Sequence, residues 1–168
     1  MKVMISIKNN TMCKLLKPIF VLLILMLSVL MGCNNSALFS DSKALNNENW
    51  KRNDTLQFDV NVDNTISAYN FYILIRNTTE YRYSNFFIFI NTVFPDKKIA
   101  CDTLECILAD EKGKWYGKGT GRLKDNKILF RRLMRFQQKG KYSMRLSHGM
   151  REQTITGIAD IGLMIQKN

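Results

Sequence analysis

The chain has 168 residues, of which 46% are hydrophobic, and a formal net charge of +11. Its first 32 residues differ sharply in composition from the rest, and the 136 that follow have room for one folded domain but not for two. Four of the 25 basic residues lie in the first stretch, so 21 basic against 14 acidic residues remain, a net charge of +7.

The first 32 residues have the pattern of an export signal. Lysines up to Lys17 precede an apolar run from Ile19 to Met31, about 13 residues, which is the length of a signal core and short of the roughly 20 that span a bilayer. The run closes with Leu30-Met31-Gly32-Cys33, the form of a lipoprotein cleavage site. We therefore expect lipid attachment at Cys33. Two or three acyl chains there would anchor the protein firmly to a membrane. The alternatives are a short core helix or an uncleaved anchor.

The residues that follow Cys33 are polar, and their few apolar side chains have no clear period. Such a segment is typical of a linker that holds a domain off a membrane. We therefore expect three parts, which are a signal peptide over 1–32, a lipidated tether over 33–49 and a folded domain over 50–168.

The first half of the expected domain indicates strands. Apolar and polar residues alternate over 56–63, as in a half-buried strand. The segments 69–77 and 85–94 are apolar on both faces and rich in aromatic and β-branched residues, which is typical of central strands in a two-layer core. The link over 78–80 between them suits a hairpin.

The second half continues the pattern. A turn over 95–98 precedes a strand over 102–110, and the glycines of 113–121 favour turns and short extended pieces. The segment 128–136 is ambiguous between strand and helix, and strand fits better. Clean alternation returns over 141–148 and 161–166. About eight short strands without a long helix predict an all-β fold, a single β-sandwich of the jelly-roll or immunoglobulin-like kind.

Few side chains in the domain suit catalysis or metal binding. Cys101 and Cys106 cannot pair if they share one strand, because five extended residues span about 16 Å, whereas a bulge or turn before Asp102 would allow a disulfide. Their spacing, without a second Cys or His pair, disfavours zinc. His148 is the single histidine, and its position in an alternating strand favours a packed ring bonded to backbone over a catalytic base. Asp110 and Glu111 fit an acidic turn better than a calcium site.

Charge is unevenly distributed along the chain. Between Lys112 and Arg151 thirteen basic residues face Asp125 alone, whereas residues 33–111 carry seven basic and eleven acidic side chains. This predicts a basic surface on one half of the domain. An exported, lipid-anchored protein meets no genome, so phosphorylated lipid headgroups or an acidic partner protein are better candidates than nucleic acid, with ordinary solvated charge as the alternative.

Several short strings of the chain resemble a known family. They include Asp102-Thr103-Leu104-Glu105, Leu108-Ala109-Asp110 and the glycine segment G-K-W-Y-G-K-G from Gly113 to Gly119, in a likeness that runs from about Trp50 to the C-terminus. Taken together, they resemble the gliding motility lipoprotein GldH family. The resemblance implies a component of the envelope machinery that Bacteroidota use for gliding and, in related systems, for type IX protein secretion, and it supplies no catalytic residues.

These observations lead to one main hypothesis, a noncatalytic lipoprotein of the outer membrane that faces the periplasm and binds other motility or secretion proteins. We expect no cofactor, metal, nucleic acid or small-molecule substrate. The runner-up is a carbohydrate-binding surface lipoprotein, and an envelope hydrolase that uses His148 comes third. Aromatic and arginine side chains dominate interface energetics. The partner-binding residues we expect, with the aromatic pair exposed, are therefore Lys114, Trp115, Tyr116, Lys118, Arg131, Arg132 and Arg135.

Overall fold

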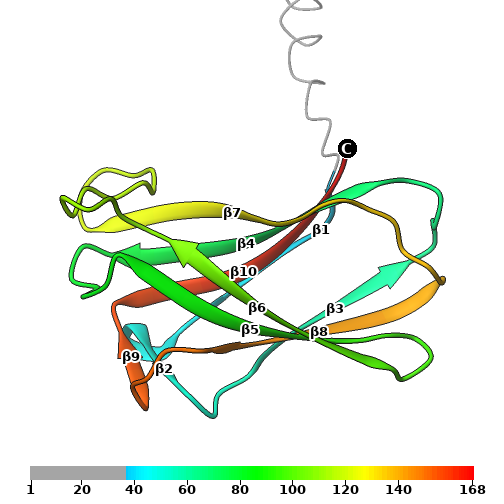
Figure 1. The fold of residues 1–168 in the computed structure, drawn as a ribbon, viewed down its shortest axis with the longest axis horizontal. Helices are drawn as coiled ribbons and strands as arrows, with labels where there is room; N and C mark the ends of the chain where they lie inside the picture. Colours follow the sequence, from blue (N-terminus) through cyan, green and yellow to red (C-terminus); the bar gives the residue numbers. More distant parts are fainter. Residues whose placement is uncertain (1–36) are drawn as a thin grey trace, which may run out of the picture. The chain divides into compact units, whose positions relative to one another are not determined.

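The computed structural model describes residues 37–168, which form ten strands and one short 3-10 turn (Figure 1). In chain order the elements are β1 (Ala37–Ala44), η2 (Asn46–Glu48), β2 (Asn49–Lys51), β3 (Leu56–Val62), β4 (Tyr69–Thr78), β5 (Asn85–Val93), β6 (Ile99–Ile107), β7 (Leu123–Met134), β8 (Gly140–His148), β9 (Thr154–Thr156) and β10 (Ile158–Lys167).

The strands form two layers. One four-stranded sheet has the order β1-β10-β4-β7, and the other has the order β3-β8-β5-β6. All of these pairs are antiparallel, and β2 pairs with β9 in a small separate ribbon. Figure 1 shows the two larger sheets stacked over one another, with the ribbon of β2 and β9 at one end. The predicted all-β sandwich is confirmed.

Alternation of side chains builds the core between the sheets. In β3, β8 and β10 every second residue points inward, and the predicted strands over 56–63, 141–148 and 161–166 are confirmed. Side chains from both sheets meet in one buried cluster, whose members include Phe58, Val60, Ile73, Ile88, Ile90, Tyr142, Leu146, Ile161 and Leu163. Burial of this apolar surface is the main force that holds the two layers together.

The central strands were also predicted correctly, but their connection was not. β4 lies inside the first sheet and β5 inside the second, so the predicted hairpin over 78–80 is wrong. The chain instead crosses between the layers, and the buried Tyr81 fixes the crossing because its hydroxyl donates to the carbonyl oxygen of Asn85 at 2.9 Å. Two neighbouring apolar strands can pair or stack, and their sequences fit both arrangements.

The start of the domain lies earlier than expected. Residues 37–44 were assigned to the tether but form β1, the edge strand that pairs with β10, and η2 and β2 follow directly. An edge strand needs few apolar side chains, because much of it faces solvent. Its main inward contact is Phe39, whose ring meets Phe58 edge to face at 6.4 Å. The tether prediction is therefore wrong for residues 37–49.

Register divides the sandwich into two ends. Ala37 pairs with Gln166, Lys167 with Tyr69, and Tyr69 with Met134. The strands β1 and β4 therefore begin at the end where β10 and β7 finish. We call this the proximal end, and the loops 63–68, 94–98 and 135–139 belong to it. The opposite, distal end carries the crossing over 79–84 and the loops 108–122 and 149–153, beside β2 and β9 (Figure 1).

Candidate functional site: the docking loop at the distal end

The predicted interaction residues lie in two separate places. Lys114, Trp115, Tyr116 and Lys118 belong to the long loop between β6 and β7, at the distal end, whereas Arg131, Arg132 and Arg135 lie where β7 reaches the proximal end. The backbone of Lys118 pairs with that of Asp125 in an isolated β-bridge, and Arg132 follows Asp125 by seven residues along β7. At about 3.3 Å per residue this is about 23 Å. The structure does not bring the two groups together.

The loop over 108–118, which we call the docking loop, is held by backbone hydrogen bonds at both ends. The Tyr116 amide donates to the Leu108 carbonyl at 2.9 Å, and Lys118 and Asp125 exchange two bonds of 2.9 and 2.7 Å. Between them, Asp110 Oδ1 accepts from the amides of Lys112 and Lys114 at 2.9 and 2.8 Å. Asp110 thus caps a tight turn, as the acidic-turn interpretation predicted, and the docking loop has a defined shape.

Two glycines of the G-K-W-Y-G-K-G segment allow this close packing. Gly119 has a φ of 135°, which strains any other residue, and a Cβ there would lie 2.6 Å from the Leu123 carbonyl oxygen. A Cβ on Gly117 would lie 2.9 Å from Asn126 Oδ1. The segment therefore lies directly against β7, which explains why glycine occurs at both positions.

Asn126 is the buried polar anchor beneath the docking loop, and sequence reasoning missed it. Its amide nitrogen donates to Asn77 Oδ1 at 2.8 Å and to the Ile75 carbonyl at 3.1 Å, so it links β7 to β4. Asn77 is itself fully buried and donates to the Thr78 carbonyl at 2.9 Å. A buried polar pair of this kind is stabilising only while its partners are in place.

The two aromatic side chains of the docking loop differ in exposure. Trp115 is half-buried and packs against the core cluster, so the prediction that it is exposed is wrong. Tyr116 is 64% exposed. A strand-like segment turns neighbouring side chains to opposite sides, which places one ring inward and the next outward. Tyr116 is thus the aromatic group that the loop presents to solvent.

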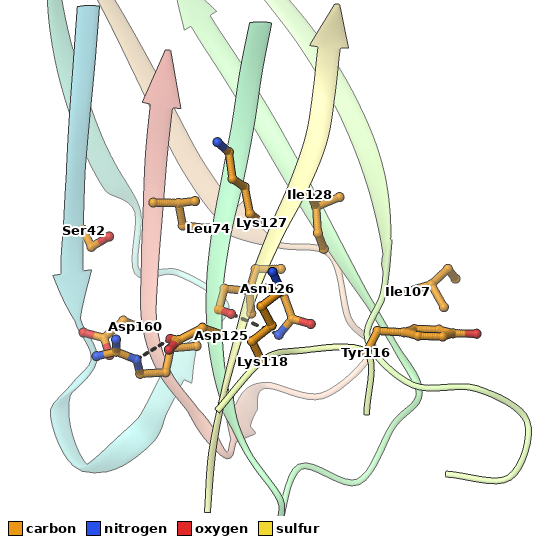
Figure 2. A pocket seen from close by; sticks show the side chains of 12 residues that line it. Ser42, Leu74, Ile107, Tyr116, Lys118, Asp125, Asn126, Lys127, Ile128 and Asp160 are labelled. Atoms are coloured by element: carbon orange, nitrogen blue, oxygen red, sulfur yellow. Dashed lines mark hydrogen bonds and ion pairs between the residues drawn. The ribbon is translucent and has the colours of Figure 1, made fainter. Parts of the chain in front are cut away.

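An open pocket of about 790 Å³ adjoins Tyr116. Figure 2 shows Tyr116 and Ile107 side by side at one end of its lining, with Ile128 and Asn126 of β7 next to them. Ile107 is 52% exposed, although it is the last residue of β6. The outward position of Ile107 in an alternating strand was the signal that could have added it to the candidate site.

Ion pairs on the outer face of the first sheet border this pocket. Arg76 Nε lies 2.6 Å from Asp125 Oδ1, and Arg76 Nη1 lies 3.4 Å from Asp160 Oδ2. The hydrogen bond from Arg76 to Asp125 raises the pKa of the guanidinium. Nearby, Arg122 binds Glu48 through two hydrogen bonds, of 2.8 and 2.5 Å, which hold the pKa of that carboxyl below its usual value. Both pairs are exposed to solvent and fasten the distal end at its surface.

The arginines of β7 have a different setting. Arg131 forms an ion pair with Asp102 of β6, across the gap between the two sheets. Beneath this pair lies an apolar pocket of about 250 Å³, which Arg135 also lines. The aromatic side chains of this lining come from strands of both sheets and from the adjoining proximal loops, and are Phe71, Phe94, Phe130, Phe136 and Tyr142. The segment is a strand, as predicted, but its pairing with β4 shifts register between Tyr69 and Tyr72, and Leu133 has a φ of 54°. These irregularities change which side chains share a face and account for the ambiguous sequence pattern.

The remaining candidate side chains are structural. His148 is buried and its ring meets Trp50 edge to face at 5.8 Å, but neither ring nitrogen has a hydrogen bond, so the predicted bond to backbone is wrong. Burial lowers the pKa of His148. Cys101 and Cys106 lie in one strand, β6, and both are free, as the spacing argument predicted.

The N-terminal predictions fall outside the described residues. The signal peptide over 1–32, the lipid attachment at Cys33 and the beginning of the tether are among residues 1–36. Within residues 37–168, no helix has the length and apolar character to cross a membrane. In the same range, no three metal-ligating side chains come together.

Comparison with known proteins gives a consistent result. The family model described as GldH lipoprotein matches residues 37–165. The gliding motility lipoprotein GldH homolog of Christiangramia forsetii is 30% identical over 89% of this chain and 94% of its own. The gliding motility lipoprotein GldH of Flavobacterium johnsoniae is 26% identical over 87% of this chain and 94% of its own.

Among solved structures, a chain described as the structure of infectious bursal disease virus Gx strain aligns with 79% of this chain and 30% of its own length. Its sequence identity is 12% and its TM-score 0.29, too low for a common fold to follow. The family match covers the sandwich from β1 to all but the last two residues of β10, and it starts where the structure places the first strand. The chain belongs to the GldH lipoprotein family.

Proposed function

We propose that the protein is a noncatalytic accessory component of the gliding motility or type IX secretion machinery, held by lipid at Cys33 in the outer membrane and facing the periplasm. Its relatives, which are named as gliding motility lipoproteins, support the link to motility. The isolation of His148 supports a noncatalytic role, because neither ring nitrogen contacts a hydroxyl, thiol or carboxylate that could share a proton.

The observation that carries the docking role is the exposed Tyr116 on a fixed loop. An aromatic side chain whose backbone is already ordered loses little entropy on binding, and such residues dominate interface energetics. Ile107 stands beside it over the open pocket, so that an apolar centre is surrounded by polar and charged groups such as Lys118 and Asp125. This arrangement is that of a small protein interface.

In-cell photo-crosslinking tests the proposal. A photoreactive phenylalanine analogue replaces Tyr116 in one strain, and in a matched control it replaces Phe89, which is 44% exposed on the outer face of the other sheet. We expect crosslinks from position 116 to proteins of the gliding or secretion machinery, and few from position 89. Adducts with glycan-uptake proteins would instead favour the carbohydrate-binding alternative. Equal adducts from both positions would exclude a specific docking loop.

Alanine substitution then measures the contribution of each side chain. Replacement of Tyr116 and Ile107 together is expected to weaken partner recovery at least tenfold, as for side chains whose loss costs about 2 kcal/mol of binding. Both side chains are more than half exposed, so the unfolding midpoint of the domain is expected to stay nearly unchanged. Unaltered recovery with intact folding would show that partners bind elsewhere.

A further inference from the structure

The proximal end of the sandwich carries a concentrated positive charge. Besides Arg131, which pairs with Asp102, its loops and strand ends contain seven basic side chains and the acidic Asp63 and Asp96. Lys98 pairs with Asp96 at 3.0 Å, and Lys141 pairs with Asp59 at 2.9 Å. Of the basic side chains at the proximal end, five form no ion pair within the described residues 37–168, and these are Lys97, Arg132, Arg135, Lys139 and Lys167. The distal end differs, because Glu80, Asp110, Glu111 and Glu152 offset its basic residues.

The same end exposes large apolar side chains. Ile66 is 82% exposed and Ile99 is 64% exposed, and Leu133 and Met134 are 49% and 44% exposed. Ile66 lies in a turn that is fixed by Asn64, whose Oδ1 accepts from the amides of Ile66 and Ser67 at 2.8 and 3.1 Å. Exposed apolar residues among unpaired cations are typical of a surface that contacts lipid headgroups.

Chain length links this surface to the anchor. Ala37, where β1 begins at the proximal end, follows the predicted lipid attachment site Cys33 by four residues. Four residues of extended chain reach at most about 14 Å. With its lipid in the bilayer, the protein cannot move the proximal end far from the headgroups. The short link therefore keeps the proximal end close to the membrane surface, at an effective concentration in the millimolar range.

We propose that the proximal end is a membrane-facing surface that binds anionic lipid headgroups and orients the sandwich with its distal end away from the bilayer. This inference rests on the proposed lipid attachment at Cys33. The five unpaired cations bind the phosphates, and Ile66, Ile99 and Met134 enter the headgroup layer. Orientation is what this contact adds, because two or three acyl chains already supply firm attachment. The docking loop is thereby presented to the periplasm.

Lysine footprinting of the lipidated protein tests this orientation. The protein is reconstituted into vesicles of phosphatidylcholine with about 30 mol% phosphatidylglycerol, and its lysines are acylated and mapped by mass spectrometry. We expect labelling of Lys97, Lys139 and Lys167 to fall about fivefold or more relative to the protein in detergent. Fivefold is the change in binding constant that the attraction of one basic residue to an anionic membrane surface contributes. Labelling of Lys51 and Lys114 at the distal end should change by less than about twofold, because the attraction of an anionic surface falls off within a Debye length.

Two conditions separate headgroup binding from simple crowding. In vesicles of phosphatidylcholine alone, or at about 0.5 M salt, where the Debye length falls to about 4 Å, the protection of the proximal lysines should be lost. Protection that persists in both conditions would overturn the claim that anionic headgroups are bound. Equal protection of both ends, or stronger protection of Lys114, would overturn the orientation.

A matched pair of variants assigns the effect to the named residues. One variant combines Arg132→Ser, Arg135→Ser and Lys139→Ser. The ratio of oriented to unoriented protein is expected to fall about 100-fold, since each cation contributes about fivefold, and the protection of Lys97 should be lost. The control combines Arg82→Ser, Lys112→Ser and Arg151→Ser, three distal cations without an ion pair in the described part of the chain. Equal loss in both variants would refute the proximal surface.

This experiment contains no partner protein, so its result is independent of the docking loop. Protection without crosslinks from position 116 would retain the membrane surface and reject the proposed docking role. Crosslinks without protection would do the reverse.

Discussion

Gly117→Ala is expected to destabilise the domain and to disturb the docking loop at the same time. The new Cβ would lie 2.9 Å from Asn126 Oδ1 and 2.9 Å from Lys124 Cβ, closer than real Cβ atoms come to their neighbours. One of these neighbours is part of a buried hydrogen-bond network, and the other is the root of a side chain on β7. Neither can move away without displacing the strand.

The magnitude follows from two contributions. Insertion of a methyl group into a packed site typically costs about 1–3 kcal/mol. Displacement of the Asn126 amide would leave Asn77 Oδ1 buried without its donor, which adds about 1–3 kcal/mol if the bond is lost completely. Because partial relaxation reduces both, we expect a loss of about 2–4 kcal/mol of unfolding free energy.

Urea unfolding followed by tryptophan fluorescence measures this loss. With a slope of about 2 kcal/mol per molar urea, the midpoint should fall by about 1–2 M. Gly113→Ala is the matched control, because Gly113 has a φ of 78° but nothing lies within 4 Å of its Cβ position. The control should lose only the backbone cost, about 1–2 kcal/mol.

A double-mutant cycle identifies the clash. In an Asn126→Ala background the same Gly117→Ala change should cost at least about 0.5 kcal/mol less, although contact with Lys124 keeps the cost above zero. If Gly117→Ala were no more destabilising than Gly113→Ala, or showed no coupling to Asn126, the reasoning that the loop packs rigidly on β7 would be refuted.

Three further predictions concern the core and the edge strand. Burial lowers the pKa of His148 from its usual 6.5, so below pH 6.5 the unfolded chain takes up a proton that the folded chain does not. The free energy of unfolding should therefore decrease as the pH falls below 6.5, by at most about 1.4 kcal/mol per pH unit. A His148→Phe variant that kept this pH dependence would contradict the assignment. Burial raises the pKa of the Cys106 thiol to about 12, so a disulfide reagent at about pH 8 should modify Cys101 at once and Cys106 only on unfolding, and rapid modification of both in native protein would argue against the buried thiol. Phe39→Ala should cost about 1–2 kcal/mol in thermal or urea unfolding through the lost contact with Phe58, and no loss would mean that residues 37–44 are a tether after all.

Periodicity was sufficient to predict the strands that bury one face. In the segments that contain Phe58, Tyr142 and Leu163, every second residue is apolar over about six residues. Each of these segments is a strand in the structure. The shortest strands were not predictable in this way. β2 and β9 have three residues each, too few for a period, and they form because Trp50 and Ile155 pair and are both buried.

The sequence pointed to the loop of the candidate site but not to its arrangement, and it missed Asn126 and Ile107. Aromatic and glycine content identified the docking loop, yet only the structure shows that Trp115 packs inward and Tyr116 outward. Sequence cannot supply this, because a loop has no fixed period from which the direction of a side chain could be read. Ile107 joins Tyr116 through the fold, since the loop returns to pair beside the last residues of β6.

Charge per stretch of sequence is a poor guide to charge on a surface. The basic segment between Lys112 and Arg151 suggested one basic half of the domain, but β7 runs from the distal to the proximal end and distributes these residues along its length. Arg122 pairs with Glu48 at one end, Lys127 lies over the Tyr72 ring at 4.0 Å in the middle, and Arg135 is unpaired at the other end. Lys97 and Lys167 join Arg135 there from distant parts of the chain. The fold, rather than the sequence, therefore creates the cationic end that the short link to Cys33 would hold against a membrane.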